Sequence, residues 1–305
     1  MTFDFRTFFK GMAMGAADVV PGVSGGTIAF ISGIYDRLLE SIRRINPSLI
    51  GHLRQHGLAS TWAHINGGFL LTLLAGIATS FASLARVITY LLTDHPIPVW
   101  SFFFGLILVS IVHISKQVGG AKPGNLMAAV AGFGFAYFIT AANPLALDPT
   151  HLNVVLAGMV AICAMILPGI SGSFILLLLG LYVPIIAAVK EFDVTIIGLF
   201  LGGAVLGLLT FSHLLSFLLT RFRGLTLSFL CGLMVGTLNK VWPWKQTLTT
   251  RINSKGVEVP LTEQTLSPWQ FAEISGHDPQ LLLALGCMAL GFGLVWGLER
   301  YAGQE

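Results

Sequence analysis

Long apolar segments, separated by short polar stretches, run through most of the chain. A helix needs about 20 mostly apolar residues to cross a bilayer, and several segments are close to that length. These are Gly68–Leu92, Val99–Ser115, Leu126–Ala141, Thr195–Leu219, Leu225–Asn239 and Leu281–Leu298. The pattern therefore predicts an all-α integral membrane protein with several continuous spans.

Two further apolar segments, Gly11–Glu40 and Val154–Lys190, are each interrupted near the middle. The interruptions read Pro21-Gly22-Val23-Ser24-Gly25-Gly26 and Pro168-Gly169-Ile170-Ser171-Gly172-Ser173. Proline removes a backbone donor and clashes with the preceding turn, and glycine allows a sharp turn. We therefore expect hinges at Pro21, Gly22, Pro168 and Gly169.

The arms on either side of each interruption are too short to cross the membrane alone. An arm of about 12–15 residues reaches roughly 20 Å as a helix, whereas the hydrocarbon core is about 30 Å thick. Each interrupted segment is thus predicted to be a re-entrant hairpin of two half-helices. A kinked full span is the alternative.

The interrupted segments belong to a longer internal repeat. Ser24 and Ser171 are 147 positions apart, and farther along a shift of 127 positions aligns Gly76 with Gly203. The first repeat would cover residues 1–142, with its hairpin at about 11–40 and a basic interfacial stretch at 37–66. The second would cover residues 143–305, with its hairpin at about 154–190 and an outer polar loop at 240–279. Each repeat then has one hairpin and three spans, which predicts inverted-topology repeats in a single membrane domain.

Composition and charge support this picture. The 305 residues are 54% hydrophobic and 10% charged, whereas soluble domains carry about 25% charge. A net charge of +3 does not point to a nucleic-acid partner, and the three cysteines lack metal-ligand spacing. No cleavable signal peptide is expected. With the N-terminus in the cytoplasm, most of the 17 Lys and Arg residues fall on the inner side, as the positive-inside rule predicts.

Interfacial contacts with membrane lipids are expected at three places. In residues 37–66, arginines alternate with apolar residues, which is typical of a helix that lies on an anionic leaflet. Tyr35 and Tyr182 occupy equivalent positions in the two repeats. We expect them to be anchors at opposite membrane interfaces.

The two motifs are the candidate substrate site. The first amide groups of a helix lack internal partners, and leaving them unsatisfied in lipid costs several kcal/mol each. Two facing helix starts would therefore favour an anion, for which phosphate is well suited. The predicted binding residues are Ser24, Gly25, Gly26, Thr27, Ser171, Gly172 and Ser173. The hydroxyl groups of the serines and the threonine can donate to the ligand or cap the helices.

A few ionisable residues can assist this site. Asp18 is the lone acid in the first arm of either hairpin, and Met165 is its counterpart. A carboxylate at that depth is costly, so we expect it to couple transport to a proton or a cation. Arg86 and His213 are equivalent under the 127-residue shift, as are His113 and Lys240. Each of these can contact an anionic head group or simply extend towards the interface.

The two motifs resemble those of a known family. The string Met14-Gly15-Ala16-Ala17-Asp18-Val19-Val20-Pro21-Gly22-Val23-Ser24-Gly25-Gly26-Thr27 closely resembles the signature of the PopT polyprenyl-phosphate transporters, formerly a domain of unknown function. The string Ala164-Met165-Ile166-Leu167-Pro168-Gly169-Ile170-Ser171-Gly172-Ser173-Phe174 resembles their second motif. The resemblance implies a multi-pass protein of the bacterial cytoplasmic (inner) membrane. It also implies flipping of undecaprenyl phosphate, the lipid carrier of peptidoglycan synthesis, from the outer to the inner leaflet by alternating access.

Two other functions remain open at this point. A membrane polyprenyl-pyrophosphate phosphatase would also use Ser/Gly-rich hairpins, but it needs a nucleophile or base and usually an arginine. Neither motif has a nearby Glu or Arg, so we assign no catalytic residue and expect a transporter rather than an enzyme. A small-ion transporter is the second alternative. No cofactor is expected beyond a coupling H⁺ or Na⁺, and a homo-oligomer is possible.

Overall fold

The computed structural model describes residues 4–20, 23–120, 122–142, 144–145, 147–252 and 258–302. Most of these residues are helical. The elements are α1 (Phe5–Val19), α2 (Gly25–Ile31), α3 (Tyr35–Arg43), α4 (Ser48–His64), α5 (Gly67–Asp94), α6 (Pro96–Gln117), α7 (Pro123–Ala141), α8 (His151–Ile166), α9 (Gly172–Leu178), α10 (Tyr182–Glu191), α11 (Val194–Arg221), α12 (Arg223–Val241), β1 (Lys245–Ile252), β2 (Glu258–Thr265), α13 (Pro268–Ser275) and α14 (Leu281–Ala302).

The predicted continuous spans coincide with long apolar helices. Among the described residues, α5, α6, α7, α11 and α12 are long and apolar enough to cross a membrane. The apolar part of α14, Leu281–Gly297, is slightly shorter. The chain is therefore a multi-pass membrane protein, as predicted.

The two halves of the chain repeat the same order of helices. In the first half, α1, α2, α3, α5, α6 and α7 correspond in order to α8, α9, α10, α11, α12 and α14 of the second half. Helices α2 and α9 each have 7 residues, and α5 and α11 each have 28. Helix α4 is inserted in the first half only, and β1, β2 and α13 in the second only.

Close helix crossings at glycine repeat as well. A Cβ atom added to Gly76 of α5 would lie 2.1 Å from the Phe8 carbonyl oxygen of α1, and one added to Gly203 of α11 would lie 2.1 Å from that of Val155 of α8. These contacts coincide under the 147- and 127-residue shifts. Since no side chain fits there, the backbones touch directly.

The other long helices pair across the two halves. Helix α6 packs against α14, and α7 packs against α12. A Cβ atom on Gly105 of α6 would lie 2.0 Å from the Met288 carbonyl oxygen, and one on Gly232 of α12 would lie 2.0 Å from that of Ala129. The last helix of each half, α7 or α14, thus packs against a helix of the other half, and these contacts join the two halves.

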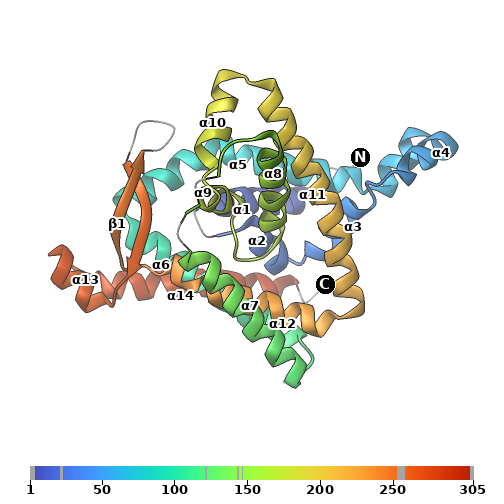
Figure 1. Ribbon diagram of the computed structural model, residues 1–305. Coiled ribbons are helices and arrows are strands. Elements are labelled where there is room, and N and C mark those ends of the chain that lie inside the picture. The colour runs from blue at the N-terminus through green and yellow to red at the C-terminus, as the bar shows by residue number, and fades with distance from the viewer. Residues whose placement is uncertain are drawn as a thin grey trace.

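The motif segments lie in the middle of this body. Helices α1, α2, α8 and α9 are surrounded by the longer helices, whereas α4 and the β1–β2 hairpin lie at opposite ends of the molecule (Figure 1). Buried residues of all four motif helices belong to the main hydrophobic core.

The hairpin prediction needs a correction in its second arms. Each arm was expected to be one half-helix, but it is broken again at Gly33 and Gly180, whose φ angles are +70° and +75°. The short helices α9 and α10 meet at 109°. Each predicted hairpin is therefore three short helices, and re-entry into the membrane remains a prediction. The predicted hinges Pro21 and Gly22 lie outside the described residues.

The extramembrane predictions were partly wrong. Residues 37–66 form two helices, α3 and α4, rather than one, and α4 is kinked at Gly57, whose φ is +75°. The polar loop at 240–279 contains an antiparallel β1–β2 hairpin followed by α13, which the all-α expectation omitted. Alternating threonines favour these strands.

We expect Gly105→Ala to destabilise the protein by about 1–3 kcal/mol, because the new methyl group has to push α14 away from α6. Thermal unfolding of the detergent-purified protein measures this effect. Gly286→Ala on α14 is the matched control, since nothing lies within 4 Å of its Cβ position. Equal melting temperatures for the two variants would show that this crossing does not limit stability.

Candidate functional site

The C-terminal end of α8 is a broken helix end inside the protein. The last carbonyl groups of a helix lack internal partners, and burying them unpaired is costly. Here residues of the first motif segment supply the donors. The Ser24 hydroxyl donates to the Met165 carbonyl oxygen at 3.0 Å, and the Tyr35 hydroxyl donates to that of Ile166 at 3.1 Å.

The second motif also hydrogen-bonds to the first. The Gly169 N–H donates to the Thr27 hydroxyl at 3.0 Å. A Cβ atom on Gly26 would lie 2.5 Å from the Ile166 carbonyl oxygen, so only glycine fits at this contact. Ser24 and Thr27 are fully buried. The two motifs therefore meet, as expected, but their hydroxyl groups bind the protein itself in this structure.

The start of α2 already contains an anionic group. The Asp18 carboxylate accepts a hydrogen bond from the Gly25 N–H at 2.7 Å. The Ser24 hydroxyl caps the helix by accepting from the Gly26 N–H at 3.0 Å. Negative charge is favourable at this end of a helix. Asp18 therefore occupies the place where a substrate anion was predicted to bind.

The start of α9 is different. Met165 replaces Asp18, and its side chain faces Gly172 just as Asp18 faces Gly25. The Ser171 side chain does not cap α9 but lies 2.9 Å from the Ser173 hydroxyl oxygen. Ser173 is exposed, whereas its counterpart Gly26 is buried. The second motif is thus the more accessible of the two.

A basic cluster lies beside the second motif. The Lys240 ammonium is 5.3 Å from the ring centre of Phe174, the residue after Ser173. Lys245 lies 3.6 Å from the ring centre of Trp100, and both lysines are within 4 Å of the Glu263 carboxylate. Burial lowers the pKa of Lys245 to about 8, although Glu263 opposes this shift. The cluster has one more positive charge than negative, which favours an anion nearby.

The remaining predicted residues have varied positions. Gly169 is buried with φ +89°, which supports the expected turn after Pro168. Arg86 and His213 are exposed, and no hydrogen bond or ion pair seen among the described residues joins either of them to a motif. His213 instead lies 2.7 Å from the Leu209 carbonyl oxygen of its own helix. Their role in binding remains a prediction.

Tyr35 was misplaced by sequence reasoning. It was expected at the membrane interface, but it is 3% exposed and holds the end of α8. The sequence shows the same spacing between the motif serine and the tyrosine in both repeats, but it does not show that the Tyr35 hydroxyl donates to the Ile166 carbonyl oxygen. The contacts of Lys245 were also missed: Trp100 is far from it in sequence, and Glu263 lies on the paired strand β2, which was not predicted. No group of three or more potential metal ligands occurs in the described part of the chain.

Comparison with known proteins agrees with the motif pattern. Residues 14–259, which include both motifs, match the family model described as VCA0040-like, undecaprenyl phosphate translocase-like. A polyprenyl-phosphate transporter of Vibrio cholerae is 60% identical over 97% of this chain and 96% of its own length. One from Staphylococcus aureus is 33% identical over 79% of this chain and 87% of its own. No solved structure matches. The chain therefore belongs to the undecaprenyl phosphate translocase-like family.

Proposed function

We propose that this protein flips undecaprenyl phosphate from the outer to the inner leaflet of the bacterial cytoplasmic membrane, which returns the lipid carrier to cell-wall synthesis. The relatives are named as transporters of polyprenyl phosphate. The observation that carries the mechanism is the contact between the two motifs in the middle of the apolar body. A lipid phosphate has to pass such a region, while its prenyl chain stays in the lipid.

The phosphate first binds at the second motif in this proposal. Ser173 is exposed there, the Ser171 hydroxyl is adjacent, and Lys240 supplies a positive charge next to Phe174. Charge-assisted hydrogen bonds from hydroxyl and ammonium groups suit a phosphate monoester. The first motif is closed by Asp18 and by its contacts with the end of α8.

The packing of the two halves is consistent with alternating access. Helix α3 of the first half packs against α11 of the second, and Arg223 lies 3.4 Å from Asp36 on α3. Among the described residues, the counterpart pair α10 and α5 shows no comparable packing. Transport would exchange these arrangements, so that the first motif opens when the second closes.

Substitutions in the second motif are expected to slow transport more than they lower stability. Ser173→Ala and Lys240→Gln should each reduce the rate roughly tenfold, because each removes one charge-assisted contact of about 1.5 kcal/mol or more. A leaflet-resolved assay of undecaprenyl phosphate in proteoliposomes measures the rate. Ser83→Ala is the control, since this exposed serine bonds only to its own helix.

Two other measurements on the purified protein could reject the proposed function. One is release of phosphate from undecaprenyl pyrophosphate by the purified protein, which would indicate an enzyme. The other is ion flux that needs no lipid phosphate, which would indicate a small-ion transporter. Equal rates for wild type, Ser173→Ala and Lys240→Gln would remove the second motif from the phosphate path.

Asp18 is expected to couple flipping to a proton or sodium gradient, because its carboxylate lies at the start of α2. Asp18→Asn keeps an oxygen that can accept from Gly25 but removes the charge. The variant should therefore fold and flip lipid at a rate that no longer responds to an imposed pH or sodium gradient. Asp94→Asn, at an exposed helix end, should respond as wild type does. A gradient response that persists in Asp18→Asn excludes this role.

A further inference from the structure

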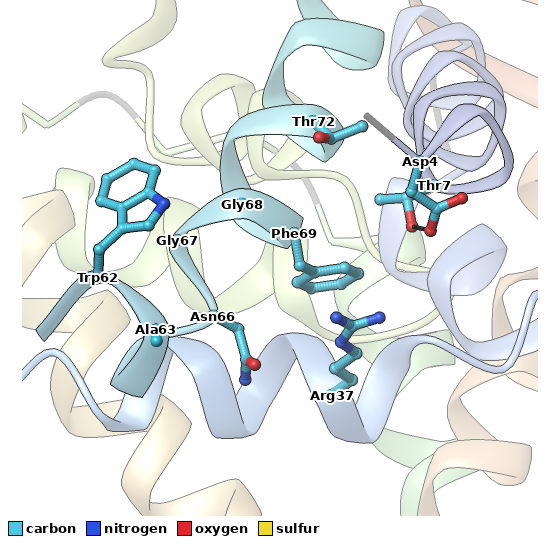
Figure 2. Close-up of a pocket in the computed structure, with 10 residues that line it drawn as sticks. All are labelled: Asp4, Thr7, Arg37, Trp62, Ala63, Asn66, Gly67, Gly68, Phe69 and Thr72. Atoms are coloured by element: carbon cyan, nitrogen blue, oxygen red, sulfur yellow. Dashed lines mark hydrogen bonds between the residues drawn. The ribbon is translucent and has the colours of Figure 1, made fainter. Parts of the chain in front are cut away.

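A pocket of about 520 Å³ lies where the beginnings of α1 and α5 meet α3 and α4 (Figure 2). None of the residues that line it belongs to either motif. The lining includes Arg37, Gly67, Gly68, Phe69 and Thr72. It is therefore separate from the predicted transport site.

The pocket contains a helix start without a side-chain cap. Asn66 precedes α5 but turns its side chain toward the helix that carries Arg37, where its amide donates to the Ser41 hydroxyl at 3.1 Å (Figure 2). In the second half the corresponding residue is Asp193. Its carboxylate accepts from the N–H groups of Thr195 and Ile196 and so fills the start of α11. At the start of α5, no carboxylate of the described residues accepts from the helix amides in this way.

Two side chains add groups that suit an anion. The Arg37 guanidinium lies 4.2 Å from the ring centre of Phe69, which orients it at the pocket. Thr72 is 8% exposed and lines the pocket, yet its hydroxyl group has no hydrogen-bond partner in the described residues. Among the described residues the fully buried polar atoms without a partner belong to Ser80, Ser101 and Asn239 rather than to Thr72, so the Thr72 hydroxyl is accessible from the pocket, where a ligand oxygen can accept from it.

The second half shows that the fold alone does not require these groups. The counterparts of Arg37, Gly67 and Thr72 under the repeat shifts are Pro184, Val194 and Leu199. Thr7, another lining residue, corresponds to Val154. At these four pocket positions, the polar or small residue of the first half is thus replaced by an apolar residue in the second half.

The charges of the lining favour a single negative charge on the ligand. Asp4 also lines the pocket, and its carboxylate accepts from the Arg6 N–H at 3.0 Å and from the Thr7 hydroxyl at 2.6 Å. Asp4 balances Arg37, so the helix start supplies the remaining positive potential. A phosphodiester carries one charge, whereas a phosphate monoester carries about 1.5 to 2 at neutral pH.

The position of the pocket favours a lipid. Helix α5 is long and apolar enough to span the membrane, so its first residues lie near the level of lipid head groups. The adjacent helix α4 exposes Ile50 and Leu58, at 60% and 80%. Apolar side chains exposed in this way are suited to an interfacial helix.

We propose that this pocket binds the phosphodiester head group of a membrane glycerophospholipid, through Arg37, the amide groups at the start of α5 and the Thr72 hydroxyl. This inference does not depend on the proposed transport activity. The site would hold a resident lipid beside the beginnings of α1 and α5 rather than the transported one.

Native mass spectrometry of the full-length protein released from detergent can test the site, with phosphatidylglycerol and a diacylglycerol of the same acyl chains as probes. Wild type should retain phosphatidylglycerol and not diacylglycerol. Arg37→Gln should lower the retained fraction roughly fivefold or more, and Thr72→Val, which keeps the shape, about threefold. Arg54→Gln is the matched control, because Arg54 is exposed on α4 and does not line the pocket.

A second variant keeps the test independent of folding defects. Asp4→Asn preserves a good helix cap but removes the negative charge, so it should increase binding of phosphatidic acid relative to phosphatidylglycerol. The proposal is overturned if Arg37→Gln and Arg54→Gln lower binding equally, or if diacylglycerol binds as well as phosphatidylglycerol. Displacement of the lipid by equimolar inorganic phosphate would also overturn it, in favour of a free-phosphate site. Failure here with intact flipping would leave the transport proposal unaffected.

Discussion

The structure depends on how a helix can end inside an apolar protein. Helix α8 stops at Ile166, in the middle of the apolar body (Figure 1), and its last carbonyl groups would be costly to bury unpaired. Ser24 and Tyr35 of the first half donate to them, and Gly169 donates back to Thr27. The two broken segments are therefore mutually dependent: each supplies polar groups that the other cannot satisfy within itself. This explains why the motifs occur as a pair.

The long helices provide the support that this contact needs. Glycines let α1 touch α5 and α8 touch α11 at the backbone, so each motif arm is held by one long helix of its own half. The pairs α6–α14 and α7–α12 then join the halves. A motion of one half against the other would have to preserve the first set of contacts and change others, such as the packing of α3 against α11. Backbone contacts without side chains are suited to a rigid unit, because they leave few rotamers to rearrange.

Sequence reasoning worked best where a physical rule acts along the chain. Apolar length located α5, α6, α7, α11, α12 and α14, and the two shifts aligned α2 with α9 and α5 with α11. It failed where a partner lies far away in sequence. Tyr35 was placed at an interface, since nothing local indicates that its hydroxyl would reach Ile166. The β1–β2 hairpin was predicted only as part of an outer polar loop, because its strands follow no apolar alternation. The roles of the motif residues in binding, and of Arg86 and His213, remain predictions.

The repeat also made the two halves look more alike than they are. At the first motif the start of α2 is filled by Asp18, whereas Met165 leaves the start of α9 without a carboxylate. At the next pair of equivalent helices the carboxylate is in the other half: Asp193 accepts from the amides at the start of α11, whereas Asn66 does not cap the start of α5. Of these two pairs of equivalent helix starts, each half thus has one that accepts its own carboxylate and one that does not. Single substitutions at equivalent positions therefore make the two halves chemically different, although their helices follow the same order: the first half has a carboxylate at the start of its short motif helix, and the second has one at the start of its long helix.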